Sequence, residues 1–441
     1  MPTNKCFSAF MLLVYTPKIT SRLDFVFKHI CTRILGLKVG FTDNVEVFQQ
    51  EEGPKMVYAK QNLDASVFLE AHGLLHQVGF EDVSINLNNW DEVPCFFACR
   101  RHSLIDYDIF SASFYLLSRY EEYLPHVKDE MGRFPAVKSL AHRGGFLDRP
   151  VVDIWAMKFG RLLQREFPEL VFGDRSITVH HTVQVQSPYL YLHRGIIHNL
   201  AGFLNDFYRL QFDRLALRAQ VLLKLRKDPY NVFTWLTNAS KNDRTQLTVF
   251  FFFGQSKKFK NYINNRRKQV LTLVKFVSDY VDTGLLFSAY KNEQLDKMKA
   301  EKRRLEALTH RQMGPASIVD QQIDLPHRYR MLVELEVKQE ASMYYYDSPG
   351  FRAGTCTPFL FYDLDYEIKT PLTIYPTTAD AHFLGSMKEG ARFELLKALF
   401  MEVDRVSGHF VMAFRNTDLV DQKKTKFWRK LLTTDSYEFF R

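Results

Sequence analysis

Residues 247–254 read Leu-Thr-Val-Phe-Phe-Phe-Phe-Gly, a short and almost continuously apolar run that ends at a glycine. Such a run without polar alternation is typical of a strand buried on both faces of a parallel sheet. Apolar strand-like segments and amphipathic helix-like segments alternate around it. The predicted strands cover residues 182–185, 284–287 and 410–414, and the predicted helices cover 194–226, 269–280 and 292–308. This alternation predicts a (β/α) barrel of seven or eight strands.

The first part of the chain shows a second, separate α/β pattern. A strand is predicted at residues 10–15, and helices are predicted at 23–35, 67–78 and 110–124. A chain of 441 residues is long for one core, because domains usually hold about 100–200 residues. Turn-forming residues interrupt the apolar pattern at 172–174. The sequence therefore predicts an N-terminal α/β domain at residues 1–172 and the barrel at 173–441.

Composition limits the class of protein. Hydrophobic residues make up 46% of the chain and aromatic residues 15%, which indicates a folded globular protein. The net charge of +9 favours an anionic partner or simply a solvated basic surface. The five scattered cysteines predict no disulfide framework, so a reducing, cytoplasmic location is expected. No apolar run reaches the ~18–20 residues that a membrane-spanning helix needs.

Three motifs carry a resemblance to a known family. They are Gly-Phe-Arg-Ala-Gly-Thr-Cys-Thr-Pro-Phe at 350–359, Thr-Val-Gln-Val-Gln at 182–186, and Ser-Phe-Tyr-Leu-Leu-Ser-Arg-Tyr-Glu-Glu-Tyr at 113–123. In this order they resemble bacterial polysaccharide deacetylase-like proteins of the Bacteroidota type. In that family a NodB-type deacetylase barrel follows an N-terminal α/β domain, and the match of motif order extends over nearly the whole chain.

The resemblance implies metal-dependent hydrolysis, but the residues that would perform it are replaced. Such an enzyme needs metal ligands, usually one Asp and two His, with a carboxylate base and a His acid. The base position holds Gln184 and the acid position Arg415, and neither side chain exchanges protons near neutral pH. The metal positions hold Gln186, Leu286 and Met313. An uncharged amide is a weak ligand, leucine is none, and a thioether suits soft Cu(I) better than zinc.

The same comparison indicates residues that could still bind a ligand. An acidic family position is retained as Glu340, and Arg352 is placed at the barrel mouth. Arg352 either orients a ligand or forms a structural salt bridge. Together with Gln184, Gln186 and Arg415, Arg352 would form a cationic, amide-lined pocket for anionic or hydroxyl-rich ligands. We therefore expect a pseudoenzyme that binds carbohydrate, an anionic glycan or a partner, and that needs no cofactor.

Two alternatives remain open at this point. An active, divergent N-deacetylase could carry a zinc or another divalent metal at a relocated site formed by His181, Asp380 and His382. A basic run around Phe259 and Tyr262 could instead contact an anionic polymer; it comprises Lys257, Lys258, Lys260, Arg266, Arg267 and Lys268. We expect this run to be a solvated loop, with anionic glycan as the next interpretation. Nucleic acid is the least expected partner, because the chain contains no recognisable nucleic-acid-binding module.

Overall fold

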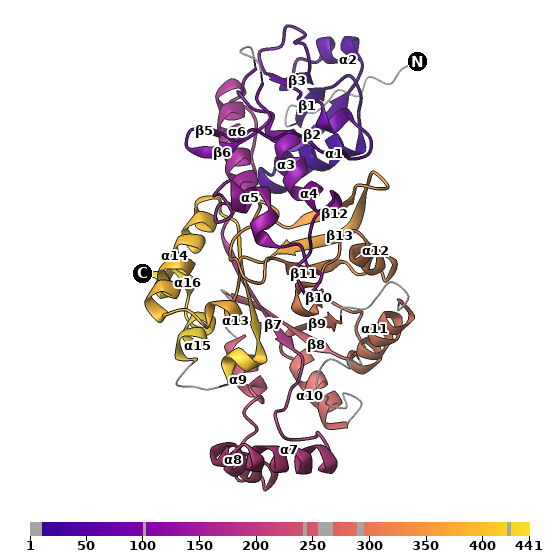
Figure 1. Ribbon diagram of the computed structural model, residues 1–441. Helices are drawn as coiled ribbons and strands as arrows, with labels where there is room; N and C mark the ends of the chain where they lie inside the picture. Colours follow the sequence, from indigo (N-terminus) through magenta and orange to yellow (C-terminus); the bar gives the residue numbers. More distant parts are fainter. Residues whose placement is uncertain (1–10, 100–102, 241–244, 255–267, 289–294, 421–424) are drawn as a thin grey trace.

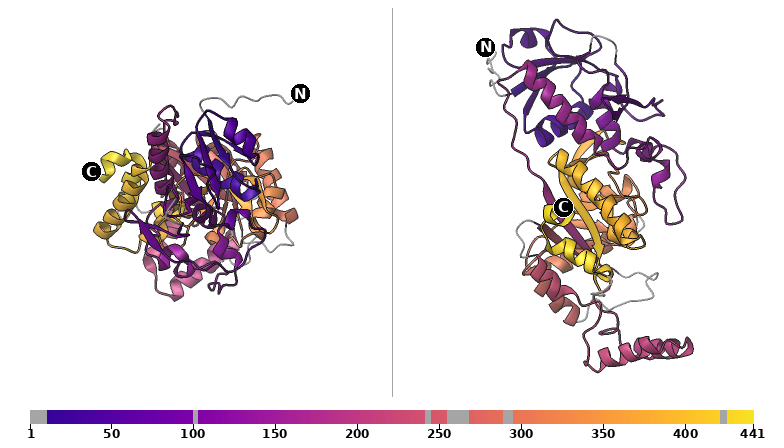
Figure 2. Two further views of the ribbon diagram at one scale, coloured as in Figure 1. Left: turned by 90° about the horizontal axis from the view of Figure 1, so that it is seen from above. Right: turned by 90° about the vertical axis from the view of Figure 1, so that its left-hand side faces the viewer.

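The computed structural model describes residues 11–99, 103–240, 245–254, 268–288, 295–420 and 425–441. It is an α/β structure with two main sheets, which lie one beyond the other along an elongated molecule (Figures 1 and 2). The smaller sheet and its helices form one end of the molecule. The larger sheet occupies the middle, and a pair of helices projects at the other end.

The smaller sheet consists of four parallel strands in the order β2-β1-β3-β4. Their bounds are β1 Met11–Tyr15, β2 Lys38–Thr42, β3 Lys55–Ala59 and β4 Phe68–Glu70. The predicted first strand is confirmed over its described residues. The helix predicted at 23–35 is also present, as α1 (Ser21–Phe27) continued by the π-helical η1 (Lys28–Ile34).

The helix predicted at residues 67–78 is wrong. Residues 68–70 form strand β4, which pairs with β3 and is buried at every position, and a short 3-10 turn, η2 (Leu74–His76), follows. Gly73 separates the two with a φ of 118°, which a helix cannot contain. The apolar spacing of this segment fits a helix, but pairing with β3 decides its conformation.

The helix predicted at 110–124 is present but divided. It forms α3 (Ile109–Leu117) and α4 (Tyr120–Tyr123), which are separated by Arg119 in a left-handed conformation. The remaining elements of this part are α2 (Val45–Gln50), β5 (Asn88–Trp90), β6 (Val93–Cys95), η3 (Ala136–Lys138), α5 (Leu140–Arg143) and α6 (Val151–Glu166).

The larger sheet has nine strands in the order β12-β13-β11-β10-β9-β8-β7-β15-β14, and every pair except β12–β13 is parallel. The apolar run at 247–253 lies in central strand β8 and just beyond it, as predicted. The strands are β7 Thr178–Val185, β8 Thr245–Phe252, β9 Asp282–Phe287, β10 Ala316–Ile318, β11 Gln339–Met343, β12 Phe359–Asp363, β13 Ile368–Pro376, β14 Ala379–Asp380 and β15 His409–Arg415.

The predicted closed barrel is not confirmed, because the outermost strands β12 and β14 do not pair with each other. The sheet is nevertheless curved so that one stretch of chain connects distant strands. Strand β13 continues through Thr377 and Thr378 into β14. The Thr377 amide donates to the Met343 carbonyl on β11 (3.2 Å), and the Thr378 amide donates to the Val411 carbonyl on β15 (2.8 Å).

Helices accompany the larger sheet, those in the predicted ranges among them, and the first two project away from it (Figure 1). They are α7 Ile196–Tyr208, α8 Phe212–Leu222, α9 Phe233–Ala239, α10 Lys268–Ser278, α11 Leu295–Thr309, α12 His327–Glu334, α13 Ala381–Leu384, α14 Glu389–Arg405, α15 Lys426–Thr433 and α16 Ser436–Phe440, with the short turns η5 Val319–Gln321 and η6 Asn416–Leu419. Within the described ranges, no helix combines the length and apolarity that crossing a bilayer requires.

One buried apolar cluster continues through both sheet layers, so the division at residue 172 stays a prediction.

Candidate ligand-binding site

The carboxyl ends of several parallel strands meet at one end of the larger sheet, which we call the mouth. Arg415 ends β15, Asp380 ends β14, and Gln184 lies one residue before the end of β7. Asp320 belongs to the turn η5 directly after β10. Parallel strands bring such terminal residues together, and the Arg415 Nη2 lies 3.6 Å from the Asp320 Oδ1.

Gln184 is held by hydrogen bonds inside the sheet. It is buried and pairs in register with Arg415 of β15. Its Nε2 donates to the Ser317 Oγ (3.0 Å), and the Ser317 and Ser342 hydroxyl oxygens lie 2.9 Å apart. Gln186 follows on the same strand face, and its buried Nε2 has no hydrogen-bond partner within the described part of the chain. Two neutral amides therefore occupy the places where the family resemblance expects carboxylates.

The floor below these amides is apolar. Leu286 packs with Phe250, Phe252, Val319 and Ala341 in a buried cluster. Met313, in contrast, lies three residues before β10 begins, at the end of the sheet opposite the mouth. Its backbone amide donates a hydrogen bond to the Glu306 Oε1 (3.0 Å). Grouping Met313 with Gln186 and Leu286 is therefore wrong. The two family metal positions that lie here do not fit a divalent metal, because Gln186 offers a neutral amide and Leu286 has no donor atom.

Asp380 is the buried carboxyl group of the mouth, with 4% of its surface exposed. Its Oδ1 accepts from the His382 amide (2.8 Å), whereas its Oδ2 has no hydrogen-bond partner in the described structure. Burial raises the pKa of Asp380 to about 6, and the nearby Arg415 opposes this effect. His382 Nδ1 lies 3.1 Å from the Asp418 Oδ1, and this hydrogen bond raises the pKa of the imidazole.

The relocated metal site of His181, Asp380 and His382 is not assembled. His181 alternates with Gln184 along β7 and therefore points to the other face of the sheet. Its ring packs edge-on against Phe414 at 5.6 Å, and burial lowers the pKa of this imidazole to about 3. Among the residues that the structure describes, no group of three or more His, Cys, Asp and Glu side chains is arranged to hold a metal ion.

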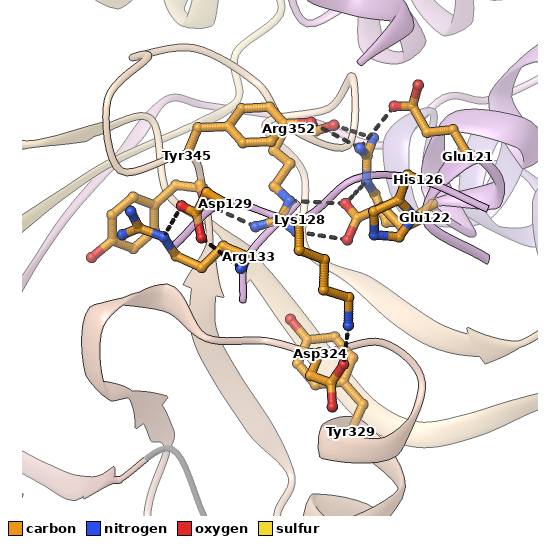
Figure 3. A network of polar contacts seen from close by, with 12 residues as sticks. Glu121, Glu122, His126, Lys128, Asp129, Arg133, Asp324, Tyr329, Tyr345 and Arg352 are labelled. Carbon is orange, nitrogen blue, oxygen red and sulfur yellow. Dashed lines mark hydrogen bonds and ion pairs between the residues drawn. The ribbon is translucent and has the colours of Figure 1, made fainter. Parts of the chain in front are cut away.

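Arg352 forms a structural salt bridge and does not present free donors to a ligand (Figure 3). Its Nε and Nη2 donate to the Glu122 Oε1 (3.0 Å) and Oε2 (2.7 Å), and its Nη1 donates to the Tyr344 carbonyl (3.1 Å). Arg119 joins the same network through Glu122 (2.8 Å) and Glu121 (2.9 Å). Of the two interpretations of Arg352, the structure has the ion pair, although Arg352 also lines a small cavity together with Arg133.

The rest of the 350–359 motif also ties the two sheet layers together. Asp153 of α6 accepts hydrogen bonds from the Thr355 hydroxyl (2.6 Å), the Cys356 amide (3.0 Å) and the Thr357 hydroxyl. Gly350 has a φ of 140°, and a Cβ there would lie 2.3 Å from the Leu147 carbonyl oxygen. The 350–359 motif therefore forms contacts between the layers.

Glu340 does not line the mouth either. It lies in the first half of β11, with no exposed surface, and its Oε2 accepts from the Tyr329 hydroxyl of α12 (2.7 Å). Burial raises its pKa to about 7, although hydrogen bonds from Ser342 and Tyr329 lower it. Glu340 is thus a buried carboxyl group without access to a ligand, which corrects its assignment to the pocket.

The second cation of the mouth is Arg133, which the sequence did not indicate as a site residue. Its guanidinium lies 4.6 Å from the centre of the Tyr346 ring, and that of Arg415 lies 5.9 Å from the same ring. The Arg133 Nε is held by the Asp129 Oδ2 (2.7 Å), and its Nη1 donates to the Asp320 carbonyl (3.3 Å). Figure 3 shows Arg133 paired with Asp129 near the Arg352 network. No local motif indicates the contact between Arg133 and Tyr346, because the two residues are distant in sequence.

The basic run around Phe259 and Tyr262 lies outside the described residues, apart from Lys268 at the start of α10. Its interpretation as a basic loop or an anionic-glycan contact stays a prediction.

Comparison with known proteins gives one family match, to part of the chain, and several distant structural similarities. Residues 12–168 match a model described as "Family of unknown function (DUF7033)". No curated protein matches. Similar solved structures include a wild-type CE4 family pseudoenzyme from Bacillus anthracis, at 9% identity and a TM-score of 0.30, with 60% of each chain covered. A mutant of that protein with restored enzymatic activity has 8% identity and a TM-score of 0.31, covering 60% of this chain and 64% of the mutant.

A putative polysaccharide deacetylase from Mycobacterium smegmatis is also similar, at 8% identity and a TM-score of 0.35, covering 61% of this chain and 91% of that chain. The chain spans less than two thirds of the length of the Bacillus anthracis pseudoenzymes that it matches. At these identities and scores the similarity describes only a shared mixed α/β arrangement with parallel strands.

Proposed function

We propose that this chain is a polysaccharide deacetylase-like pseudoenzyme whose mouth binds an acidic or hydroxyl-rich carbohydrate without cleaving it. The observation that carries the proposal is the placement of Arg133 and Arg415 around Tyr346, beside the neutral Gln184. Guanidinium groups recognise carboxylates by charge-assisted, often paired hydrogen bonds, and an aromatic ring offers a surface for a sugar ring. The mouth thus combines groups suited to binding, and its family base and acid positions hold residues unsuited to hydrolysis.

The chemistry of the same residues supports the proposed lack of hydrolysis. The side-chain amide of Gln184 donates a hydrogen bond to Ser317. Gln184 has no basic nitrogen or carboxylate that could accept a proton. Arg415 keeps its proton at any physiological pH and so cannot act as a general acid that cycles. Loss of a general acid or base lowers the rate by about 10²–10⁴, and loss of metal coordination removes the Lewis acid as well.

Replacing Arg415 by Gln is expected to weaken binding of an acidic oligosaccharide by about 10–100-fold, because a hydrogen bond to a charged group contributes about 1.5–3 kcal/mol. Isothermal titration calorimetry with oligogalacturonate measures this change. The matched control is Arg405→Gln, which alters an exposed arginine on α14 that pairs with Glu402. Equal affinities of wild type and Arg415→Gln would contradict the assignment of the mouth.

A second candidate function is residual deacetylation with Asp380 as the base, because Asp380 is buried beside Arg415 with a pKa raised to about 6. We expect no acetate release from chito-oligosaccharides and less than stoichiometric zinc in the purified protein. Stoichiometric zinc, together with acetate release that Asp380→Asn and a chelator abolish, would establish this function in place of the pseudoenzyme.

A further inference from the structure

The helices α7 and α8 form a hairpin that projects from the end of the molecule farthest from the smaller sheet (Figures 1 and 2). The chain enters α7 (Ile196–Tyr208) shortly after β7 and returns through α8 (Phe212–Leu222). Every residue of the hairpin is described.

The apolar side chains of the hairpin point outward. In α7 they recur at the spacing of one helix face and include Ile196 (88% exposed), Ile197 (86%), Leu204 (64%) and Tyr208 (89%). The exposed apolar set of the hairpin and its flanks comprises Ile196, Ile197, Leu200, Leu204, Phe207, Tyr208, Leu210, Phe212, Leu223 and Leu225. An exposed apolar surface of this extent marks an interaction site on a folded protein.

The inner face of the hairpin combines the buried Val221 with an unusual buried ion pair. Arg218 of α8 is buried and donates twice to the Asp206 Oδ2 of α7 (2.6 and 3.1 Å). A further contact reaches the Asn199 Oδ1 (3.4 Å). Gly202 provides the space for this side chain, because a Cβ there would lie 2.3 Å from the Arg218 Nη1. The two helices are thus joined by an ion pair, while the leucines and isoleucines of α7 are exposed.

Cations border the apolar surface. Between residues 195 and 227 the exposed charged side chains are Asp213 and the basic residues Arg209, Arg214, Lys224, Arg226 and Lys227. Five exposed cations therefore accompany one exposed carboxylate in this segment. Docking of a second copy through this surface would bring like charges together, because a two-fold interface pairs the same patch with itself.

We propose that the α7–α8 hairpin binds the surface of an anionic lipid membrane. The outward apolar side chains would enter the boundary between headgroups and acyl chains, and the bordering cations would contact anionic headgroups. Helices of 13 and 11 residues are too short to span a bilayer, which needs about 20 residues, so they would lie in its plane. The hairpin is continuous with the mouth end of β7, so this contact would hold the mouth toward the lipid surface.

Vesicle flotation tests the proposal with the full chain. We expect the wild type to float with vesicles of phosphatidylcholine mixed with phosphatidylglycerol and to bind phosphatidylcholine vesicles far more weakly. The double variant Ile197→Glu/Leu204→Glu is expected to lose at least about tenfold in affinity, because it removes buried apolar area and adds charge that anionic lipid repels. The matched control is Val78→Glu, at a residue of the smaller-sheet layer that is 78% exposed.

The cations are tested separately. Lys224→Gln and Arg226→Gln are each expected to weaken binding about fivefold, which corresponds to about 1 kcal/mol for each basic residue near an anionic surface. The exposed Lys388 on another side of the molecule serves as the control, as Lys388→Gln. Added salt should weaken the wild type and reduce the difference between it and these variants.

A direct readout is the variant Phe207→Trp, whose fluorescence should shift to the blue on binding and be quenched by brominated lipid. Circular dichroism of every variant confirms that it is folded. Wild-type protein that stays with the soluble fraction at low salt, or glutamate variants that float like the wild type, would overturn the proposal. A dimer in sedimentation velocity that Leu204→Glu dissociates would assign the surface to a second copy instead.

Discussion

Arg352→Ala is expected to lower the free energy of unfolding by about 3–5 kcal/mol, the usual cost of removing one partner from a buried ion pair. Arg352 is 3% exposed and contributes two of the hydrogen bonds that Glu122 accepts. Its guanidinium also lies 4.9 Å from the centre of the Tyr345 ring, so the variant loses packing as well as charge. Urea denaturation measures the difference.

The control is Arg405→Ala, which removes an exposed ion pair with Glu402 and should change the free energy of unfolding by about 0–1 kcal/mol. The pH dependence gives a second check. Burial alone would raise the pKa of Glu122, but Arg352 and Arg119 outweigh it and lower that pKa to about 2 from 4.5. The ion pair therefore stabilises the fold above pH 4.5, and its contribution is lost as the pH falls toward 2. A deficit as small as that of Arg405→Ala would contradict the structural role.

Glu340→Gln is expected to stabilise the protein above pH 7, by up to about 3 kcal/mol at pH 8. Burial raises the pKa of Glu340 to about 7 from 4.5, so the folded state keeps a proton that the unfolded state has already released. Stability from this group is therefore present below pH 4.5 and falls as the pH rises to 7. Glutamine has the same shape, carries no charge, and keeps an oxygen to accept from Tyr329.

Thermal or urea unfolding at pH 4 and at pH 8 measures this prediction. The variant and the wild type should be similar at pH 4 and diverge at pH 8. Glu394→Gln, which changes an exposed residue of α14, is the matched control and should leave the pH profile as it is. A variant that is less stable than the wild type at pH 8 would show that Glu340 is favoured in its ionised form.

The contacts between the two layers, the proposed lipid-binding hairpin and the mouth lie in different parts of the structure. Residues of the family motifs hold the smaller sheet against the larger one, through Arg352 with Glu122 and through Asp153 with residues 355–357. The proposed binding site lies elsewhere, at the ends of the parallel strands.

Local pattern was enough to predict four of the nine strands of the larger sheet, β7, β8, β9 and β15. The apolar run around Phe250, the alternation that places Gln184 and Gln186 on one face, and the helical spacing of α11 all depend on neighbours within a few residues. The neutral or basic identity of Gln184, Leu286 and Arg415 was also readable from the sequence, and their correspondence to catalytic and metal positions stays a prediction. The strand β4 was missed because its pairing with β3 overrides the spacing of its own side chains.

The tertiary structure alone decided which of these residues meet. It paired Arg352 with Glu122, moved Met313 and Glu340 away from the mouth, turned His181 to the opposite face of β7, and brought Arg133 to Tyr346 and Arg415. It also showed that the leucines of α7 face outward while Asp206 and Arg218 face each other. Periodicity is a property of one segment, whereas side-chain partners come from segments far apart, and no local spacing encodes which of them the packed chain brings together.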